Sequence, residues 1–163
     1  MTIIKYIIPL LCSVLFTACG SCEWTTEERQ KFNDECPKRN SFENLFIDFR
    51  GFDNNDFDSV LIKEYKDTLL LNSFKIKVDT FSSPWEKKKK SRNCRIDRKF
   101  FTNHMYKFII DSVNTFELKD MKMVVWAKGP FCPECTMGNY VIDTVTFEHD
   151  ANPSFTKKTP KIN

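Results

Sequence analysis

The chain has 163 residues and a formal net charge of +3. This length suits one domain with short flanking segments, and so small a net charge excludes a polycation that binds nucleic acid through bulk charge. The 16 phenylalanines and 4 glycines favour a β-rich domain with an aromatic core over a disordered stalk.

The first 18 residues have the pattern of a secretory signal peptide. Lys5 precedes an apolar run over residues 6–16, and two small residues follow the run. The run is shorter than the about 20 apolar residues that a membrane-spanning helix needs, and no later run approaches that length. We therefore expect residues 1–18 to direct the protein out of the cytosol and to be removed.

Residues 16–19, with the sequence Phe-Thr-Ala-Cys, resemble the lipobox that ends the signal peptide of bacterial lipoproteins. The resemblance implies cleavage before Cys19, a diacylglycerol on its thiol, and acylation of the new amino terminus, as with palmitate. Two or more acyl chains anchor a protein stably, because each buried CH₂ contributes about 0.8 kcal/mol. Gly20 is similar to the residue that follows the lipid cysteine in outer-membrane lipoproteins. The expected location is therefore the outer membrane of a bacterial cell envelope, with the membrane as a partner through Cys19.

The next segment, residues 19–41, is polar and is expected to be a lipid-anchored tether. One helical turn is expected in it, because Thr25 or Thr26 can cap a helix whose first turn carries acidic residues. The dipeptide at residues 36–37, Cys-Pro, should end that turn.

Cysteines outside the cytosol are usually paired, so the later cysteines predict disulfide bonds. With Cys22 as the spare, four candidates remain, and they allow three connectivities among which the sequence does not choose. These candidates are Cys36, Cys94, Cys132 and Cys135.

Alternating apolar and polar residues predict strands from residue 42 onward. Leu45, Ile47 and Phe49 share one face of the first strand, and Ser59–Lys66 forms a second that we expect to pair with it as a hairpin, across a turn over residues 51–56. Further strands are expected at residues 69–71, 74–78, 104–111, 115–118, 121–128 and 140–148. The last two should be neighbours, joined by a cysteine-bearing loop.

About seven to eight strands without a long amphipathic helix predict an all-β fold over residues 42–149. The expected architecture is an antiparallel β-sandwich, immunoglobulin-like or transthyretin-like, with a small barrel as the main alternative. Residues 150–163 contain two prolines and three lysines, and we expect them to be a flexible tail.

A basic segment interrupts the alternation between residues 82 and 103, and we expect it to be a long exposed loop. Its clustered charge favours either a solvated loop or a site for an anionic ligand, such as a lipid headgroup or an acidic glycan. The basic residues of this candidate site are Lys87, Lys88, Lys89, Lys90, Arg92, Arg95, Arg98 and Lys99.

Cys132 and Cys135 form a C-x-x-C pair, a spacing that thiol–disulfide oxidoreductases use. In those enzymes a helix follows the pair within a βαβ unit, whereas here a predicted strand follows. A structural disulfide is therefore the favoured interpretation, and an envelope oxidoreductase is the alternative. No metal or cofactor is predicted, because the four cysteines lack paired zinc spacing and the acidic residues 53–58 lack the glycine of a calcium loop.

No enzyme motif is present in the sequence. The lipobox at residues 16–19, a polar spacer, and the segments Asn44–Phe52 and Asp58–Tyr65 together resemble small lipoproteins of Bacteroidetes. The resemblance implies an accessory protein of the outer membrane with a β-sandwich domain and no catalytic residues. We therefore predict a non-enzymatic binding or structural module, with an envelope protein or glycan as partner.

Overall fold

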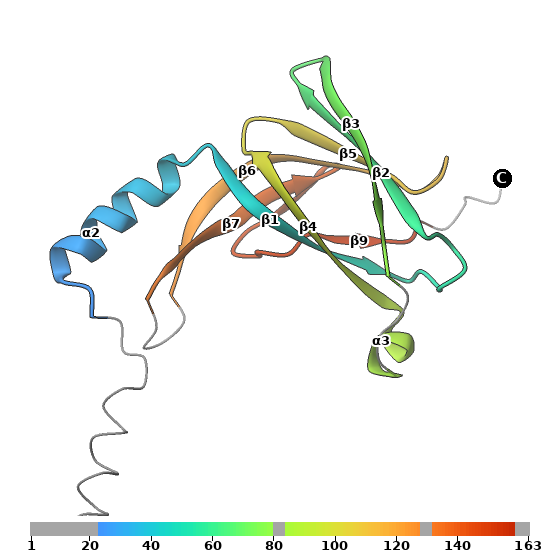
Figure 1. The fold of residues 1–163 in the computed structure, drawn as a ribbon, viewed down its shortest axis with the longest axis horizontal. Coiled ribbons are helices and arrows are strands. Elements are labelled where there is room, and N and C mark those ends of the chain that lie inside the picture. Colours follow the sequence, from blue (N-terminus) through green and yellow to red (C-terminus); the bar gives the residue numbers. More distant parts are fainter. Residues whose placement is uncertain (1–22, 80–83, 128–131, 159–163) are drawn as a thin grey trace, which may run out of the picture.

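The computed structural model describes residues 23–79, 84–127 and 132–158. Within these ranges the chain forms an all-β sandwich of two sheets, which confirms the predicted fold class (Figure 1). The strands are β1 (Ser41–Arg50), β2 (Ser59–Lys66), β3 (Leu69–Lys77), β4 (Ser91–Phe101), β5 (Met105–Ile109), β6 (Thr115–Trp126), β7 (Glu134–Ile142), β8 (Val145–Phe147) and β9 (Ser154–Thr156). The helices are α2 (Thr26–Glu35), the 3₁₀ helix η1 (Cys36–Lys38) and α3 (Pro84–Lys89).

The smaller sheet has the order β4-β1-β9, and the larger sheet has the order β3-β2-β5-β6-β7-β8. All strand pairs are antiparallel except β1–β9, which is parallel over residues 48–50 of β1. Among the described residues the strands thus divide three and six, whereas an immunoglobulin constant domain divides four and three. The larger sheet is largely a meander, and α2 lies beside one end of the sandwich (Figure 1).

The core lies between the two sheets and is rich in phenylalanine, as the composition predicts. Leu45, Ile47 and Phe49 are buried on the inner face of β1, which confirms the alternation expected there. Phe155 of β9 is fully buried, and its ring stacks on that of Phe116 with the centroids 4.9 Å apart. Burial of each such side chain stabilises the folded state by about 1.5–3 kcal/mol.

The predicted hairpin of the first two strands is wrong, because β1 and β2 lie in different sheets. The connection between them is a packed crossover and not a tight turn. Phe52 is fully buried, and the rings of Phe52 and Phe57 both contact the ring of Phe49 edge-on. These aromatic side chains direct the chain from one layer into the other.

The predicted long loop over residues 82–103 is also wrong, because residues 84–89 form α3 and residues 91–101 form β4. β4 is not recognised from the sequence because most of its residues are polar. Cys94, Ile96 and Phe100 are buried, but a buried arginine precedes them and exposed charged residues stand between them. The apolar alternation is therefore too sparse to be recognised.

The ends of the domain also differ from the prediction. Residues 154–156 are a core strand and not part of a flexible tail, because Phe155 fills the centre of the sandwich. At the other end α2 has ten residues and not one turn, and Thr25, one of the two predicted caps, forms a capping box with Glu28.

Several strand boundaries shift as well. The predicted strands at 69–71 and 74–78 are one strand, β3, and those at 115–118 and 121–128 are one strand, β6. The predicted strand at 140–148 is broken into β7 and β8 at Asp143, whose φ is +54°. β6 and β7 are neighbours, as expected, but Cys135 lies inside β7 and not in the loop.

Candidate binding groove

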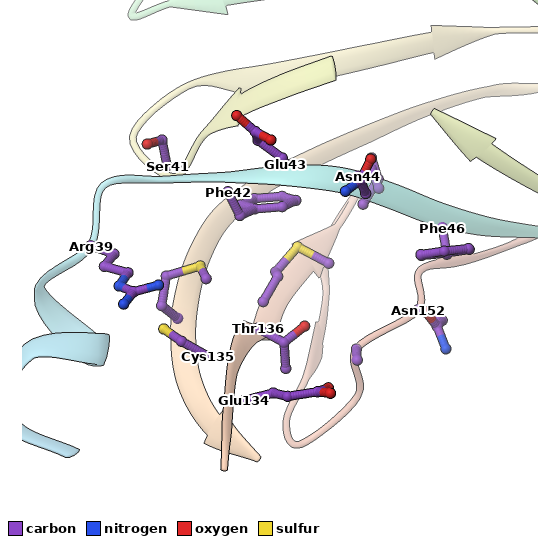
Figure 2. A pocket seen from close by; sticks show the side chains of 14 residues that line it. Arg39, Ser41, Phe42, Glu43, Asn44, Phe46, Glu134, Cys135, Thr136 and Asn152 are labelled. Atoms are coloured by element: carbon purple, nitrogen blue, oxygen red, sulfur yellow. The ribbon is translucent and has the colours of Figure 1, made fainter. Parts of the chain in front are cut away.

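A cavity of about 330 Å³ opens between β1 and β7, and we call it the β1–β7 groove (Figure 2). Phe42, Asn44 and Phe46 line it from β1, while Thr136 and Met137 line it from β7. The groove therefore lies where the two sheets of the sandwich meet along one side. Its lining combines apolar side chains and uncharged polar groups with three charged residues, Arg39, Glu43 and Glu134.

Within the described ranges, two strands lack a neighbour along part of their length, and the groove lies beside these unpaired edges. β1 pairs with β4 along one edge, but its second edge pairs with β9 only over residues 48–50. β7 pairs with β6 along one edge, and its second edge pairs with β8 only over residues 140–142. Among the described strands none occupies the space between residues 41–47 of β1 and residues 134–137 of β7.

The segment from Asp150 to Ser154 closes one end of this seam. The Asp150 N–H donates to the Gly138 carbonyl of β7, and the Asp48 N–H of β1 donates to the Pro153 carbonyl, both at 2.9 Å. Asn152, between these two contacts, lines the groove. The chain thus bridges β7 to β1 at one end and leaves the other end open.

A second cavity of about 470 Å³ continues from the first, since Phe46 and Asn152 line both. Asp48 and Arg50 line this extension and form an ion pair, with Arg50 Nε 2.5 Å from the Asp48 carboxylate. The extension is thus bordered by charges that already have a partner.

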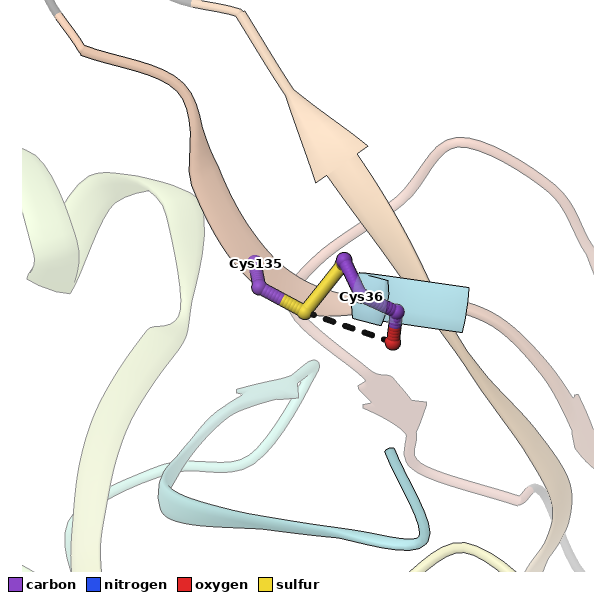
Figure 3. Close-up of a disulfide and its surroundings, with 2 residues drawn as sticks. All are labelled: Cys36 and Cys135. Carbon is purple, nitrogen blue, oxygen red and sulfur yellow. Dashed lines mark hydrogen bonds between the residues drawn. A yellow bond between two sulfur atoms is a disulfide. The ribbon is translucent and has the colours of Figure 1, made fainter. Parts of the chain in front are cut away.

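A disulfide between Cys36 and Cys135 holds the start of β1 beside the groove (Figure 3). Cys36 lies in η1 and is fully buried, and Cys135 lies in β7 and lines the groove. The bond crosses a sequence separation of 99 residues. It fixes η1 against the larger sheet and so sets the position from which β1 begins.

The prediction that Cys94 forms a disulfide is wrong, because its thiol is free and buried in β4. Burial raises the pKa of that thiol above its ordinary value, which makes it a poor nucleophile. Cys132 is disulfide-bonded but not to Cys135, because Cys135 bonds to Cys36. The C-x-x-C pair is therefore not a dithiol of the kind that oxidoreductases use, and these sulfurs are not available as zinc thiolates.

Arg92, one of the predicted anion-binding residues, is buried in the domain, with 2% of its surface exposed. Its guanidinium donates to the carbonyls of Phe57, Val78 and Asp79, at 2.7, 2.9 and 3.0 Å. The group also lies 4.3 Å from the centroid of the Phe57 ring. Burial lowers the pKa of Arg92 from its ordinary value. Its donors thus bind the protein's own backbone.

The other predicted anion-binding residues do not converge on one site. Lys90 pairs with Asp53 at 3.0 Å, and Arg95 pairs with Asp97 at 2.5 Å. The remaining residues lie on α3 or over aromatic rings, Arg98 over Phe74 and Lys99 over Phe101. These residues are Lys87, Lys88, Lys89, Arg98 and Lys99. One of the eight contacts a groove residue, since Arg95 donates to Asn44 Oδ1 at 3.2 Å.

A cluster of Glu64, His104 and Tyr106 was missed by sequence reasoning. Glu64 Oε1 lies 2.7 Å from His104 Nδ1 and accepts a hydrogen bond of 3.0 Å from the Tyr106 hydroxyl. Burial raises the pKa of Tyr106 far above its ordinary value. Because forty positions separate Glu64 from His104, no local sequence pattern predicts this contact. The cluster holds the turn between β4 and β5 against β2.

Among the described residues, no group of three histidine, cysteine or acidic side chains is placed to hold a metal ion. In the same ranges, no helix has the length and apolar character needed to cross a bilayer. Comparisons of the chain with models of protein families, with curated proteins and with solved structures found no match. Cys19 and residues 1–18, which carry the lipoprotein prediction, lie outside the described residues.

Proposed function

We propose that the protein is a non-enzymatic binding module of the bacterial cell envelope, held at the membrane by a lipid on Cys19. Its ligand site is the β1–β7 groove. The observation that carries this proposal is that, among the described strands, β1 and β7 leave edges unpaired beside one cavity. Unpaired strand edges are sites at which proteins bind other molecules, unless they are covered or charged.

The disulfide supports both parts of the proposal. A bond between Cys36 and Cys135 persists in an oxidising compartment, as expected outside the cytosol. It also stiffens one wall of the groove, which lowers the entropy lost when a ligand binds there.

Lipid anchoring is tested by growing cells with an alkyne analogue of palmitate and separating their membranes. The wild-type protein and the Cys22→Ser control should carry the label and sediment with the envelope. Cys19→Ser should lose both the label and the sedimentation. A labelled Cys19→Ser protein, or an unlabelled wild type, would exclude this anchor.

Binding at the groove is tested by photo-crosslinking in cells with a benzophenone amino acid at one position. At position 136, which lines the groove, a crosslinked adduct is expected. At position 146, an exposed site on β8 outside the groove, no matching adduct is expected. Equal crosslinking at the two positions, or none at either, would remove the groove as the ligand site.

A further inference from the structure

We propose that the β1–β7 groove binds an extended polypeptide segment of another protein, which pairs with β1 as an added strand. This inference rests on the proposed function and names the chemical class of the ligand. It follows from the direction of main-chain groups, from a strand of the protein itself that binds the same edge, and from the side chains that line the groove.

The main chain of Phe46 faces the groove. Asp48 directs its N–H away from β4, because it donates to Pro153. Residues two apart in a strand direct their main-chain groups to the same side, so Phe46 points its N–H and C=O to that side as well. The pairing with β9 begins at Asp48 and does not include Phe46. A donor and an acceptor thus face a cavity that another strand can enter.

The protein already uses this edge in the manner proposed. β9 is a three-residue strand that pairs with residues 48–50 of β1 and buries Phe155 in the core. β9 runs parallel to β1, with Ser154 beside Asp48 and Thr156 beside Arg50, so it leads away from the open part of β1. A segment from another chain, placed in line with β9, would extend the same pairing along residues 41–47.

The lining of the groove suits alternating side chains. Met123 and Met137 are buried and form its apolar floor, and methionine adapts to different apolar partners. Asn44, Thr136 and Asn152 place polar groups around them. An extended segment with apolar residues at every second position would direct these toward the methionines. About six residues would span the open part of β1, at roughly 3.4 Å per residue.

A stacked sugar ring fits this groove less well than a strand does. Phe46 is the aromatic ring at the edge of the groove that is 46% exposed, but the guanidinium of Arg95 lies 5.4 Å from its centroid. One face of the ring is therefore already in contact with a cation. The main-chain groups along β1 remain as the recognition elements, and a polypeptide matches their spacing.

The test uses the purified lipidated protein in detergent and a fluorescent seven-residue peptide of alternating valine and threonine. A second probe has the same side chains but an N-methyl group on every amide, so it lacks N–H donors. Two variants are compared with the wild type. Phe46→Pro removes the N–H that faces the groove and leaves the β4 side of β1 intact, whereas the matched Phe46→Ala keeps that N–H.

We expect the peptide to bind the wild type, and to bind Phe46→Ala more weakly only by the loss of the Phe46 side-chain contacts. Binding should be at least tenfold weaker for Phe46→Pro than for Phe46→Ala, and at least tenfold weaker for the N-methylated probe than for the parent peptide, because each removes main-chain hydrogen bonds. Amide chemical-shift changes in the wild type, which need no variant, should lie in residues 41–47 and 134–137.

Several results would overturn the inference: equal binding of the N-methylated probe, no loss of binding in a folded Phe46→Pro, absence of binding to the wild type, or shifts centred on β3 or β8, the two edge strands of the larger sheet. A dimer of the protein that Phe46→Pro disrupts would assign the edge to a second copy instead. Crosslinking of a glycan at position 136 without peptide binding would leave the proposed function standing and exclude the polypeptide.

Discussion

At the scale of single residues, the buried Arg92 shows how one polar side chain can organise a core. Its guanidinium joins the crossover after β1, through Phe57, to the end of β3, through Val78 and Asp79. Three carbonyls are thereby given donors, and that of Val78 is buried, so it would otherwise lack a hydrogen bond. The residue that the sequence placed in an exposed basic loop is in fact a link between the two sheets.

Replacing Arg92 should therefore destabilise the domain. Arg92→Met keeps an apolar stem of similar length but removes all donors to the three carbonyls, and we expect a loss of about 3 kcal/mol in the free energy of unfolding. Arg92→Lys keeps the charge but not the planar set of donors, and its free energy of unfolding should fall by a smaller amount. Urea denaturation measures both, and an Arg92→Met variant as stable as the wild type would contradict this role.

The free thiol of Cys94 should be unreactive in the folded protein. Burial raises the pKa of Cys94, so the thiolate is scarce at pH 8 until unfolding restores the ordinary value near 8.5. Because the folded state holds this proton more tightly, stability should fall as the pH rises above that ordinary value. Iodoacetamide labelling in native and denaturing buffer, followed by mass spectrometry, checks the prediction. Rapid labelling of the native protein would show an accessible thiolate instead.

At the scale of elements, β9 is a strand of only three residues that nevertheless contributes a central side chain to the core. Three residues complete the smaller sheet and place Phe155 against Phe49, Phe108 and Phe116. The ring contacts are 4.8–5.8 Å between centroids, a range in which aromatic pairs attract. A segment rich in proline and lysine thus carries a central core residue.

Phe155→Ala should destabilise the protein by about 3–5 kcal/mol, because it leaves a cavity among aromatic rings. The matched control is Val145→Ala on β8, where the side chain is 57% exposed and the expected change is within about 0.5 kcal/mol. Thermal or urea denaturation of the two variants distinguishes a core strand from a flexible tail. Similar stabilities for both variants would indicate that residues 154–156 belong to a flexible tail and not to a core strand.

At the scale of the whole molecule, the disulfide between Cys36 and Cys135 ties the segment before β1 to the larger sheet. A closed loop of about 100 residues loses much of its freedom in the unfolded state, so the bond should contribute about 3–4 kcal/mol. The double variant Cys36→Ser with Cys135→Ser should lose this amount in denaturation experiments. Cys94→Ala serves as the control and should lose about 1 kcal/mol or less. A double variant that matches that control would show that the bond adds no stability.

The sequence predicts the local features of this molecule and fails for contacts between distant residues. The alternation in β1 and the boundaries of β2 are recovered, because each is a run of neighbouring residues that face one core. β4 and β9 are missed, since Arg92 occupies a core position in one and Phe155 is an isolated apolar residue in the other. The groove is also missed, because an unpaired edge depends on which strands are neighbours and no residue type marks it.

The parallel pairing of β1 with β9 has a consequence for how the protein folds. The first strand of the sandwich pairs with residues 154–156, more than 100 residues later, and the disulfide likewise joins positions 99 residues apart. Contacts between such distant residues slow folding, because the intervening chain must be ordered before they form. The sandwich therefore stays incompletely folded until residues 154–156 have been synthesised. Such a delay is compatible with passage through a secretion channel as an extended chain.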